Sequence, residues 1–262
     1  MSLNSFSMLE TRYTDDGIAE VKIVRPEKRN AINVELVQQL GQCFQDMPEN
    51  VRAIILHGEG DHFCAGLDLS EVSEHTVPQA VMLSRLWHRS FDHIQFGRAP
   101  VIAVLHGAVV GGGLELAAST HIRIAEPSAF FALPEGKRGL FVGGGGSVRI
   151  TRLMGVPRMS DMMLTGRVLN AKEGMEAGLA QYSVEAGRGL EKARELAASI
   201  ASNAAMTNYG VMHMLPRIAD QTIHDGLATE SLMAAVAQTD PSTRELLRQF
   251  LENKQNKVQF QR

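Results

Sequence analysis

The stretch Gly107-Ala108-Val109-Val110-Gly111-Gly112-Gly113-Leu114-Glu115-Leu116 organises the chain. A β-type run, Val101 to Leu105, precedes it, and the apolar residues 114–118 fit a helix that begins at the glycines. Glycine at such a turn lets the backbone approach a ligand closely and adopt a positive φ. The first N–H groups of a helix have no partner inside it, so they can hold an anion or a developing oxyanion. Because Glu115 lies about one turn inside this helix, the stretch predicts proton transfer beside a carbonyl group.

A second glutamate follows in a similar setting. Pro134-Glu135 leads into a glycine-rich loop that ends with the four glycines at 143–146. Apolar neighbours and a second carboxyl group should raise the pKa of at least one glutamate, which keeps one carboxyl protonated near neutral pH. Simpler interpretations exist for each feature: the glycines as a tight turn, Glu115 as a first-turn glutamate favoured by the helix dipole, and Glu135 as a solvated turn residue.

The composition argues against several classes of protein. The 262 residues suffice for one large domain or a domain with a small appendage, and the net charge of −3 argues against a general nucleic-acid or membrane-surface binder. Cys43 and Cys64 are too few for a disulfide framework, and residues 1–8 lack a secretory signal, so we expect a cytoplasmic protein. The histidines lack metal-ligand spacing and the glycines lack the dinucleotide spacing, so we expect no metal and no nucleotide cofactor.

The order of predicted elements indicates an α/β fold followed by a helical region. Residues 9–13 and 18–24 predict a hairpin around Asp15-Asp16-Gly17. Further strands are expected at 51–57, 101–106, 121–125 and 129–133, and helices at 34–47, 79–95, 114–118, 147–154, 161–164, 171–178 and 190–203. We expect a loop at 134–146. Helices at 207–218, 226–238 and 242–253 complete the prediction.

Six segments together resemble the crotonase (enoyl-CoA hydratase/isomerase) superfamily, in the family's order over most of the chain. They are Arg25-Pro26-Glu27-Lys28-Arg29-Asn30-Ala31, Phe63-Cys64-Ala65-Gly66-Leu67-Asp68-Leu69, residues 107–117, Pro134-Glu135-Gly136-Lys137-Arg138-Gly139, Arg152-Leu153-Met154-Gly155 and Leu164-Thr165-Gly166-Arg167. The resemblance implies a crotonase-like spiral of ββα units at residues 1–200 and a C-terminal helical trimerisation region at residues 201–262. It also implies an acyl-CoA substrate and a homotrimer or dimer of trimers.

The same resemblance implies the site residues. The backbone N–H groups of Leu67 and Gly112 would form an oxyanion hole, and Glu115 and Glu135 would be the acid/base pair. The residues implied in substrate and CoA binding are Lys28, Arg29, Ala65, Leu67, Asp68, Leu69 and Gly112. A cation suits the CoA phosphates, although Lys28 and Arg29 also fit a solvated loop.

Other positions correspond to the family less directly. Residues 81–91, with Trp87 and His88, match the family's acyl-pocket wall, and Lys254 and Lys257 fit either a 3′-phosphate contact or a solvated tail. The sequence departs from the family where an aspartate is usual and His121 stands, which we expect to alter a structural polar contact. It also departs where proline-glycine is usual and Phe141-Val142-Gly143 stands, which we expect to reshape the acyl pocket.

The leading function hypothesis is hydration of a 2-enoyl-CoA in fatty acid metabolism, with no cofactor because CoA is part of the substrate. Alternatives within the family are an enoyl-CoA isomerase, which often keeps one of the two carboxylates, and an aryl hydratase-lyase, for which Tyr209 is a candidate contact to the aryl hydroxyl. A non-catalytic binding member, for instance an RNA binder, is a different class of alternative. The slight negative charge and the lack of a basic, aromatic-laced stripe count against it.

Overall fold

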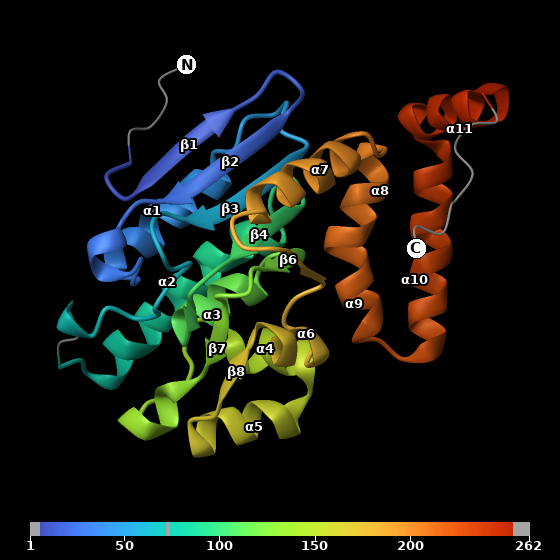
Figure 1. The fold of residues 1–262 in the computed structure, drawn as a ribbon. Helices are drawn as coiled ribbons and strands as arrows, with labels where there is room; N and C mark the ends of the chain where they lie inside the picture. Colours follow the sequence, from blue (N-terminus) through green and yellow to red (C-terminus); the bar gives the residue numbers. More distant parts are fainter. Residues whose placement is uncertain (1–5, 72–73, 254–262) are drawn as a thin grey trace. The chain divides into compact units, whose positions relative to one another are not determined.

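A six-stranded sheet lies at the centre of the computed structural model, which describes residues 6–71 and 74–253. Its strands, in spatial order, are β1 (Leu9–Tyr13), β2 (Ile18–Ile23), β3 (Ala53–Gly58), β4 (Val101–Leu105), β6 (Ile122–Ala125) and β9 (Tyr182–Ser183). The β1–β2 pair is antiparallel and forms the predicted hairpin, whereas the other neighbours pair in parallel (Figure 1). Parallel pairing requires crossover connections, and helices supply most of them.

Helices cover both faces of this sheet. Ile55 and Val104 point to one face, where they pack with Ala193 and Ala197 of α7 (Gly189–Ala201). Ile54 and other core residues point to the opposite face, toward α1 (Val34–Gln45) and α2 (Val77–Gln95). This double coverage explains why β3 and β4 read in the sequence as continuous apolar runs and not as alternating patterns.

A second, three-stranded sheet positions the segments of the opening stretch. It consists of β5 (Ala108–Val110), β7 (Phe130–Ala132) and β8 (Val168–Asn170), in that order. Between β5 and β7 lies α3 (Gly112–Ala118), which begins at the glycines as predicted. Strands β5, β8 and β9 were not predicted from the sequence, because they are held by pairing with β7 and β6 and not by a local pattern.

Three further helices follow the predicted order with altered boundaries: α4 (Gly146–Met154), α5 (Val156–Thr165) and α6 (Ala171–Glu176). Three 3-10 helices were not predicted: η1 (Pro26–Lys28), η2 (Leu69–Glu71) and η3 (Pro134–Arg138). The predicted cap of α1 is confirmed, since the Asn33 side chain accepts from the N–H of Leu36 at 2.9 Å. Residues 134–146 are not simply a loop, because Pro134 starts a 3-10 turn that contains Glu135.

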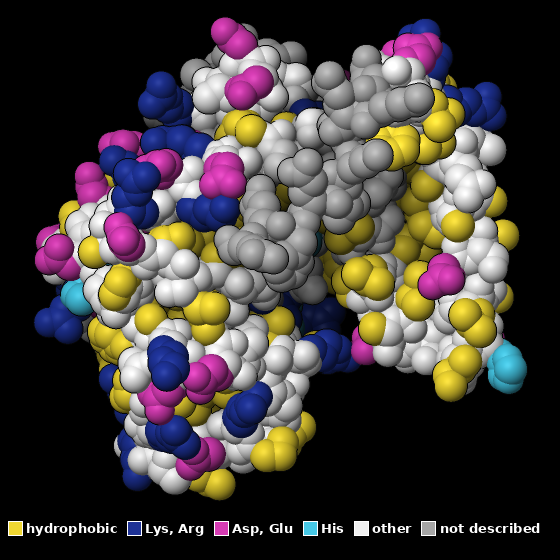
Figure 2. Space-filling model, turned by 45° about the vertical axis from the view of Figure 1, so that its right-hand side comes forward, with side chains coloured by type: hydrophobic (Ala, Val, Ile, Leu, Met, Phe, Trp, Pro, Cys, Tyr) yellow, Lys and Arg dark blue, Asp and Glu magenta, His cyan; other side chains and the backbone are white. Residues whose placement is uncertain are grey.

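The chain divides into two compact units, Met1–Ala201 and Ser202–Arg262. The second contains α8 (Ala205–Tyr209), a π-helical turn (Gly210–Met214), α9 (Leu215–Ala219), α10 (Ile223–Thr239) and α11 (Pro241–Asn253). The helix predicted at 207–218 is therefore interrupted by the π turn. Large hydrophobic side chains stay exposed on these helices, among them Ile223, Leu232 and Leu251. Figure 2 colours the hydrophobic side chains at the surface yellow. None of the helices in the described part of the chain is long and apolar enough to cross a membrane.

Candidate active site

A pocket of about 310 Å³ brings most of the predicted site residues together. Of the predicted residues, those that line it are Ala65, Leu67, Leu69, Gly112, Glu115 and Glu135. They come from the segment after β3, the start of α3 and the η3 turn. Most other lining residues are apolar, so the two carboxyl groups face a poorly solvated space.

The backbone nitrogens of Leu67 and Gly112 lie near each other at the N-terminus of α3. The neighbours of Leu67 pair with Ile32, which donates to the Gly66 carbonyl at 2.7 Å and accepts from the Asp68 N–H at 2.9 Å. Within residues 6–71 and 74–253, neither the Leu67 nor the Gly112 N–H donates to a backbone oxygen. A Cβ built on Gly112 would lie 3.5 Å from the Leu67 nitrogen, so the backbones of the two residues are neighbours at the pocket.

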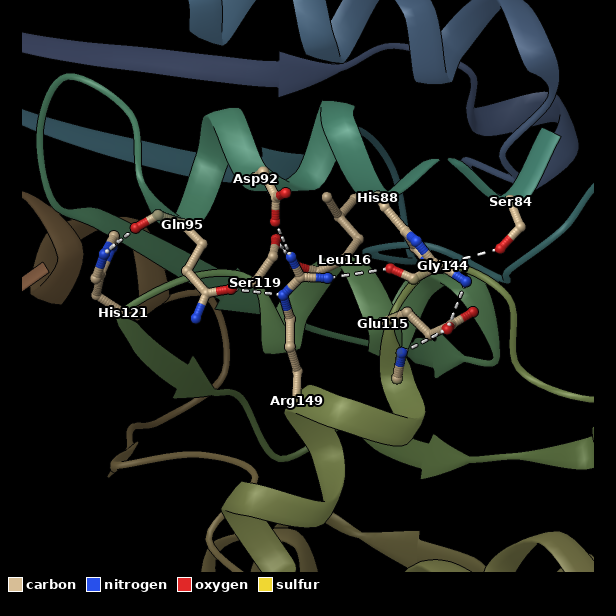
Figure 3. A network of polar contacts seen from close by, with 11 residues as sticks. Ser84, His88, Asp92, Gln95, Glu115, Leu116, Ser119, His121, Gly144 and Arg149 are labelled. Carbon is tan, nitrogen blue, oxygen red and sulfur yellow. Dashed lines mark hydrogen bonds and ion pairs between the residues drawn. The ribbon is translucent and has the colours of Figure 1, made fainter. Parts of the chain in front are cut away.

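Glu115 is buried in α3, with 3% of its surface exposed. Its Oε1 accepts hydrogen bonds from the N–H of Gly144 at 2.8 Å and of Gly146 at 2.7 Å (Figure 3). Burial raises the pKa of Glu115, the charge of Glu135 raises it further, and the two N–H donors oppose that rise. The solvated first-turn glutamate considered above is therefore excluded, since this carboxyl group is desolvated and held by backbone donors.

Glu135 lies across the pocket in η3 and is held less firmly. Within the described chain its buried Oε2 has no hydrogen-bond partner. Burial raises the pKa of Glu135, opposed by a hydrogen bond from its own backbone N–H and by the charge of Arg138. A buried carboxyl oxygen without a partner is costly, and a water molecule or a substrate atom is the natural group to satisfy it. Glu135 is therefore more than a solvated turn residue.

The Trp87 side chain of α2 packs between the glycines that begin α3 (residues 111–113) and the glycines of residues 143–146. A Cβ built on either Gly112 or Gly144 would lie 2.9 Å from its ring. The indole thus packs directly on backbone, which only glycine permits at these two positions. Within the predicted wall, Leu83, Ser84 and Trp87 line the pocket, whereas His88 does not and lies 3.3 Å from the Ser84 hydroxyl through its Nε2.

Asp68 does not line the pocket. Its carboxylate forms a 2.8 Å ion pair with Arg25 and accepts from the Ser70 N–H at 3.0 Å and the Ser70 hydroxyl at 2.6 Å. The Ser70 hydrogen bonds, with the Arg25 guanidinium, lower the pKa of Asp68 to about 2. Asp68 therefore anchors the segment that presents the Leu67 N–H.

Lys28 and Arg29 also lie outside the pocket lining. The Lys28 amine donates to the Ser70 hydroxyl at 3.3 Å, and Arg29 ends η1 in a left-handed conformation with φ 53°. Their contact with CoA stays a prediction. Lys254 and Lys257 lie outside the described residues. Tyr209 belongs to the second unit, where its ring stacks on His213 with 4.3 Å between the centroids.

The two departures from the family pattern have different consequences. His121 accepts from the Val101 N–H at 2.9 Å through Nδ1, and its Nε2 lies 3.0 Å from the Gln95 carbonyl oxygen, so it makes a structural polar contact. Phe141 lines the pocket while 72% of its surface is exposed, and Val142 is buried. The second departure therefore lies at the pocket itself.

Sequence analysis missed Arg149, whose guanidinium contacts the glycine loop around Glu115 (Figure 3). An arginine in the helix after a glycine run is the only signal the sequence offers. Across residues 6–71 and 74–253, no three His, Cys, Asp or Glu side chains gather as a metal site requires. Cys43 and Cys64 are buried free thiols.

Comparisons with known proteins agree with this architecture. The chain matches the model of the enoyl-CoA hydratase/isomerase family over residues 13–261. It is 33% identical over 248 residues to YngF of Bacillus subtilis (strain 168), described as a candidate enoyl-CoA hydratase/isomerase, with 92% of this chain and 94% of YngF covered. It is 34% identical over 190 residues to a short-chain-enoyl-CoA hydratase of Clostridium acetobutylicum, with 71% and 73% covered.

A solved structure shares the whole fold. It comes from Rhodopseudomonas palustris CGA009 and is described as a candidate enoyl-CoA hydratase. The TM-score is 0.93 at 50% sequence identity, with 98% of this chain and 100% of that chain covered. Because the family match spans nearly the whole length and the fold agrees throughout, this chain belongs to the enoyl-CoA hydratase/isomerase family of the crotonase superfamily.

Proposed function

We propose that this protein hydrates the double bond of a 2-enoyl-CoA thioester. The observation that carries the proposal is that Glu115 and Glu135 line one pocket with the Leu67 and Gly112 N–H groups. Hydration needs a base for water, an acid for C2 and donors for the thioester oxygen, and the residues that line this pocket include a candidate for each role. The name of the Clostridium relative, a short-chain-enoyl-CoA hydratase, supports the same reaction.

The reaction follows from the placement of these groups. Water, deprotonated by one carboxylate, forms a C–O bond at C3, and the double-bond electrons move through C2 toward the thioester oxygen. The Leu67 and Gly112 N–H groups stabilise that oxygen most when its charge is greatest, which lowers the barrier. A proton then passes from a carboxyl group to C2, so water is added across the double bond and the carbonyl re-forms.

Burial raises the pKa of both carboxyl groups, but the hydrogen-bond donors around them differ. Two N–H donors favour the ionised form of Glu115, which suits the base that orients water. Glu135 has no such donors on its buried Oε2, and its pKa is raised by burial, which suits a protonated acid. We therefore assign Glu115 to water activation and Glu135 to proton delivery, and the charge of Glu135 opposes ionisation of Glu115. The proton that Glu115 takes from water returns to Glu135 through solvent before the next turnover.

The wider setting follows from the same proposal. CoA belongs to the substrate, so no further cofactor is required, and Lys28 and Arg29 are the proposed phosphate contacts. The exposed hydrophobic side chains of α9–α11 support assembly into a homotrimer or a dimer of trimers. Two free, buried thiols agree with a reducing cytoplasm.

Loss of the ultraviolet absorbance of crotonyl-CoA, with longer, branched and aryl 2-enoyl-CoAs beside it, tests the proposal. We expect Glu135→Gln to lower kcat by about 10²- to 10⁴-fold while thioester binding is retained, because the general acid is lost and the shape is kept. Glu49→Gln, an exposed glutamate, is the matched control. Full activity in Glu135→Gln would refute the two-carboxylate mechanism. No hydration of any substrate by the wild type, with turnover of 3-enoyl-CoAs, would instead identify an isomerase.

A further inference from the structure

Arg149 of α4 reaches from its helix to the glycine loop and to α2 (Figure 3). Its side chain is 10% exposed. The guanidinium donates to the Gly144 carbonyl at 3.1 Å, to the Gln95 side-chain oxygen at 2.6 Å and to the Asp92 carboxylate at 2.6 Å. Three different acceptors thus fix one planar donor group, which leaves it little freedom to rotate.

Gly144 connects this arginine to Glu115. Its carbonyl accepts from Arg149 and its N–H donates to Glu115 Oε1, so one peptide residue carries both contacts. The preceding carbonyl, of Gly143, accepts from the Ser84 hydroxyl at 2.6 Å. The loop is therefore held from α4 and from α2 at neighbouring carbonyls, and its N–H groups point the other way, toward the carboxyl group.

The loop has no side chains with which to hold itself. A Cβ built on Gly146 would lie 2.8 Å from Glu115 Cγ, and one on Gly145 would meet the Arg149 guanidinium. Glycine is required for this approach, but glycine also leaves the backbone free to adopt other conformations. External anchors must supply the order that side chains would otherwise give.

We propose that Arg149 is a positioning residue, which by holding the Gly144 carbonyl aims the Gly144 and Gly146 N–H groups at Glu115. The hydrogen bonds from Arg149 to Asp92 and Gln95 are enough to join α4 to α2. The third hydrogen bond, to the Gly144 carbonyl, is the one that acts on the loop around Glu115. Among the described residues, Glu135 of η3 and Arg149 of α4 interact electrostatically with Glu115, and Asp92 and His88 of α2 lie beside Arg149 and Gly145. Removal of the N–H donors would leave burial and Glu135 to disfavour the ionised form of Glu115.

The first readout does not depend on the reaction. Infrared difference titration, with Glu115→Gln to assign the band, gives the pH midpoint at which Glu115 ionises. We expect Arg149→Gln to raise this midpoint by about one pH unit or more, the size of a lost hydrogen bond to a charged group. Arg149→Lys keeps the cation but not the three-way fork, so we expect a smaller rise. Arg152→Gln, on the next turn of α4, makes the same charge change and should leave the midpoint at its wild-type value.

The second readout rests on the proposed function. Because Glu115 must be ionised to activate water, we expect the acid limb of the pH profile of kcat/KM to move to higher pH in Arg149→Gln. If it moves by one pH unit, kcat/KM at a pH on that limb should be about tenfold lower than in the wild type. Hydration that is absent in the wild type would refute the proposed reaction, while the infrared midpoint would still test Arg149.

Two outcomes of the infrared titration of Glu115 would refute the role proposed for Arg149. An unshifted midpoint in folded Arg149→Gln protein would overturn it, and so would an Arg149→Lys midpoint equal to the wild type, since charge alone would then suffice. If Arg149→Gln does not fold, Arg149→Lys decides in the same way. The melting temperature and circular dichroism of each variant establish that it is folded.

Discussion

Replacement of Asp68 by asparagine separates a structural role from a role in binding CoA. Asp68 follows Leu67 directly, and its carboxylate is occupied by Arg25 and Ser70. We expect Asp68→Asn to destabilise the fold and to lower kcat, because the segment that presents the Leu67 N–H loses its anchor. We expect KM for the thioester to change little, since Asp68 does not line the pocket.

The magnitude follows from the pKa of Asp68. Its ordinary value of 3.8 falls to about 2 in the folded protein, which corresponds to about 2 kcal/mol of stability at pH 7. The buried Arg25 guanidinium loses this carboxylate but keeps its 2.8 Å hydrogen bond to the Ala31 carbonyl, and loss of one side of a buried ion pair can raise the cost to roughly 3 kcal/mol. A carboxyl group whose pKa is lower in the folded than in the unfolded protein stabilises the fold at pH values above the unfolded-state pKa. This stabilisation is lost as the pH falls through the folded-state pKa. The linkage contribution should therefore be about half as large at pH 3.

Urea unfolding at pH 7 and pH 3 measures this dependence, with the exposed Asp61→Asn as control. We expect the difference between wild type and Asp68→Asn to shrink at the lower pH, and the control to behave like the wild type at both. Equal stability of Asp68→Asn and wild type at pH 7, together with a raised KM, would refute the anchoring role and favour a direct contact with CoA.

Two further predictions concern the pocket. Gly66→Ala should lower kcat/KM by about 10²-fold or more, because Gly66 has φ +93° and a Cβ would lie 2.6 Å from the Val110 carbonyl oxygen, which displaces the Leu67 N–H. The control is Gly139→Ala, since Gly139 also has a positive φ (+68°) but has open space around it. Equal activity of the two variants would contradict the prediction. Phe141→Ala should leave the free energy of unfolding within about 0.5 kcal/mol of the wild type, because the side chain is exposed. The same variant should lower kcat/KM for long 2-enoyl chains several-fold relative to crotonyl-CoA, because Phe141 lines the pocket. An unchanged dependence of kcat/KM on chain length would show that Phe141 does not contact the acyl group.

The sequence predicted those elements that have a period or a cap. The Asn33 cap and the apolar face of α1 are local signals, and the hairpin turn at Asp16-Gly17 is another, so both elements were placed to within a few residues. The short strands β5 and β8 were missed because their stability comes from pairing with β7, a contact that no local pattern records.

The candidate site was predictable where its chemistry depends on small residues or carboxyl groups. Gly112 and Glu115 stand out in the sequence, and both line the pocket. The partners of Arg149 could not be predicted, because they are a backbone carbonyl and two side chains 54 and 57 residues away in the chain. For the same reason, the charge of Asp68 was visible but its ion pair with Arg25 was not.

The strand order of the large sheet has a consequence for how the protein folds during synthesis. From β2 through β3, β4, β6 and β9, each strand pairs with the edge left by the strand before it, so the sheet grows in the order in which the ribosome releases the chain. Glu115 enters the core with α3, but its two N–H donors lie about thirty residues later, at Gly144 and Gly146. Until that loop is in place, Glu115 lacks both of these donors. The same loop also packs against the Glu115 side chain, so the step that brings the donors is also a step that buries the carboxyl group.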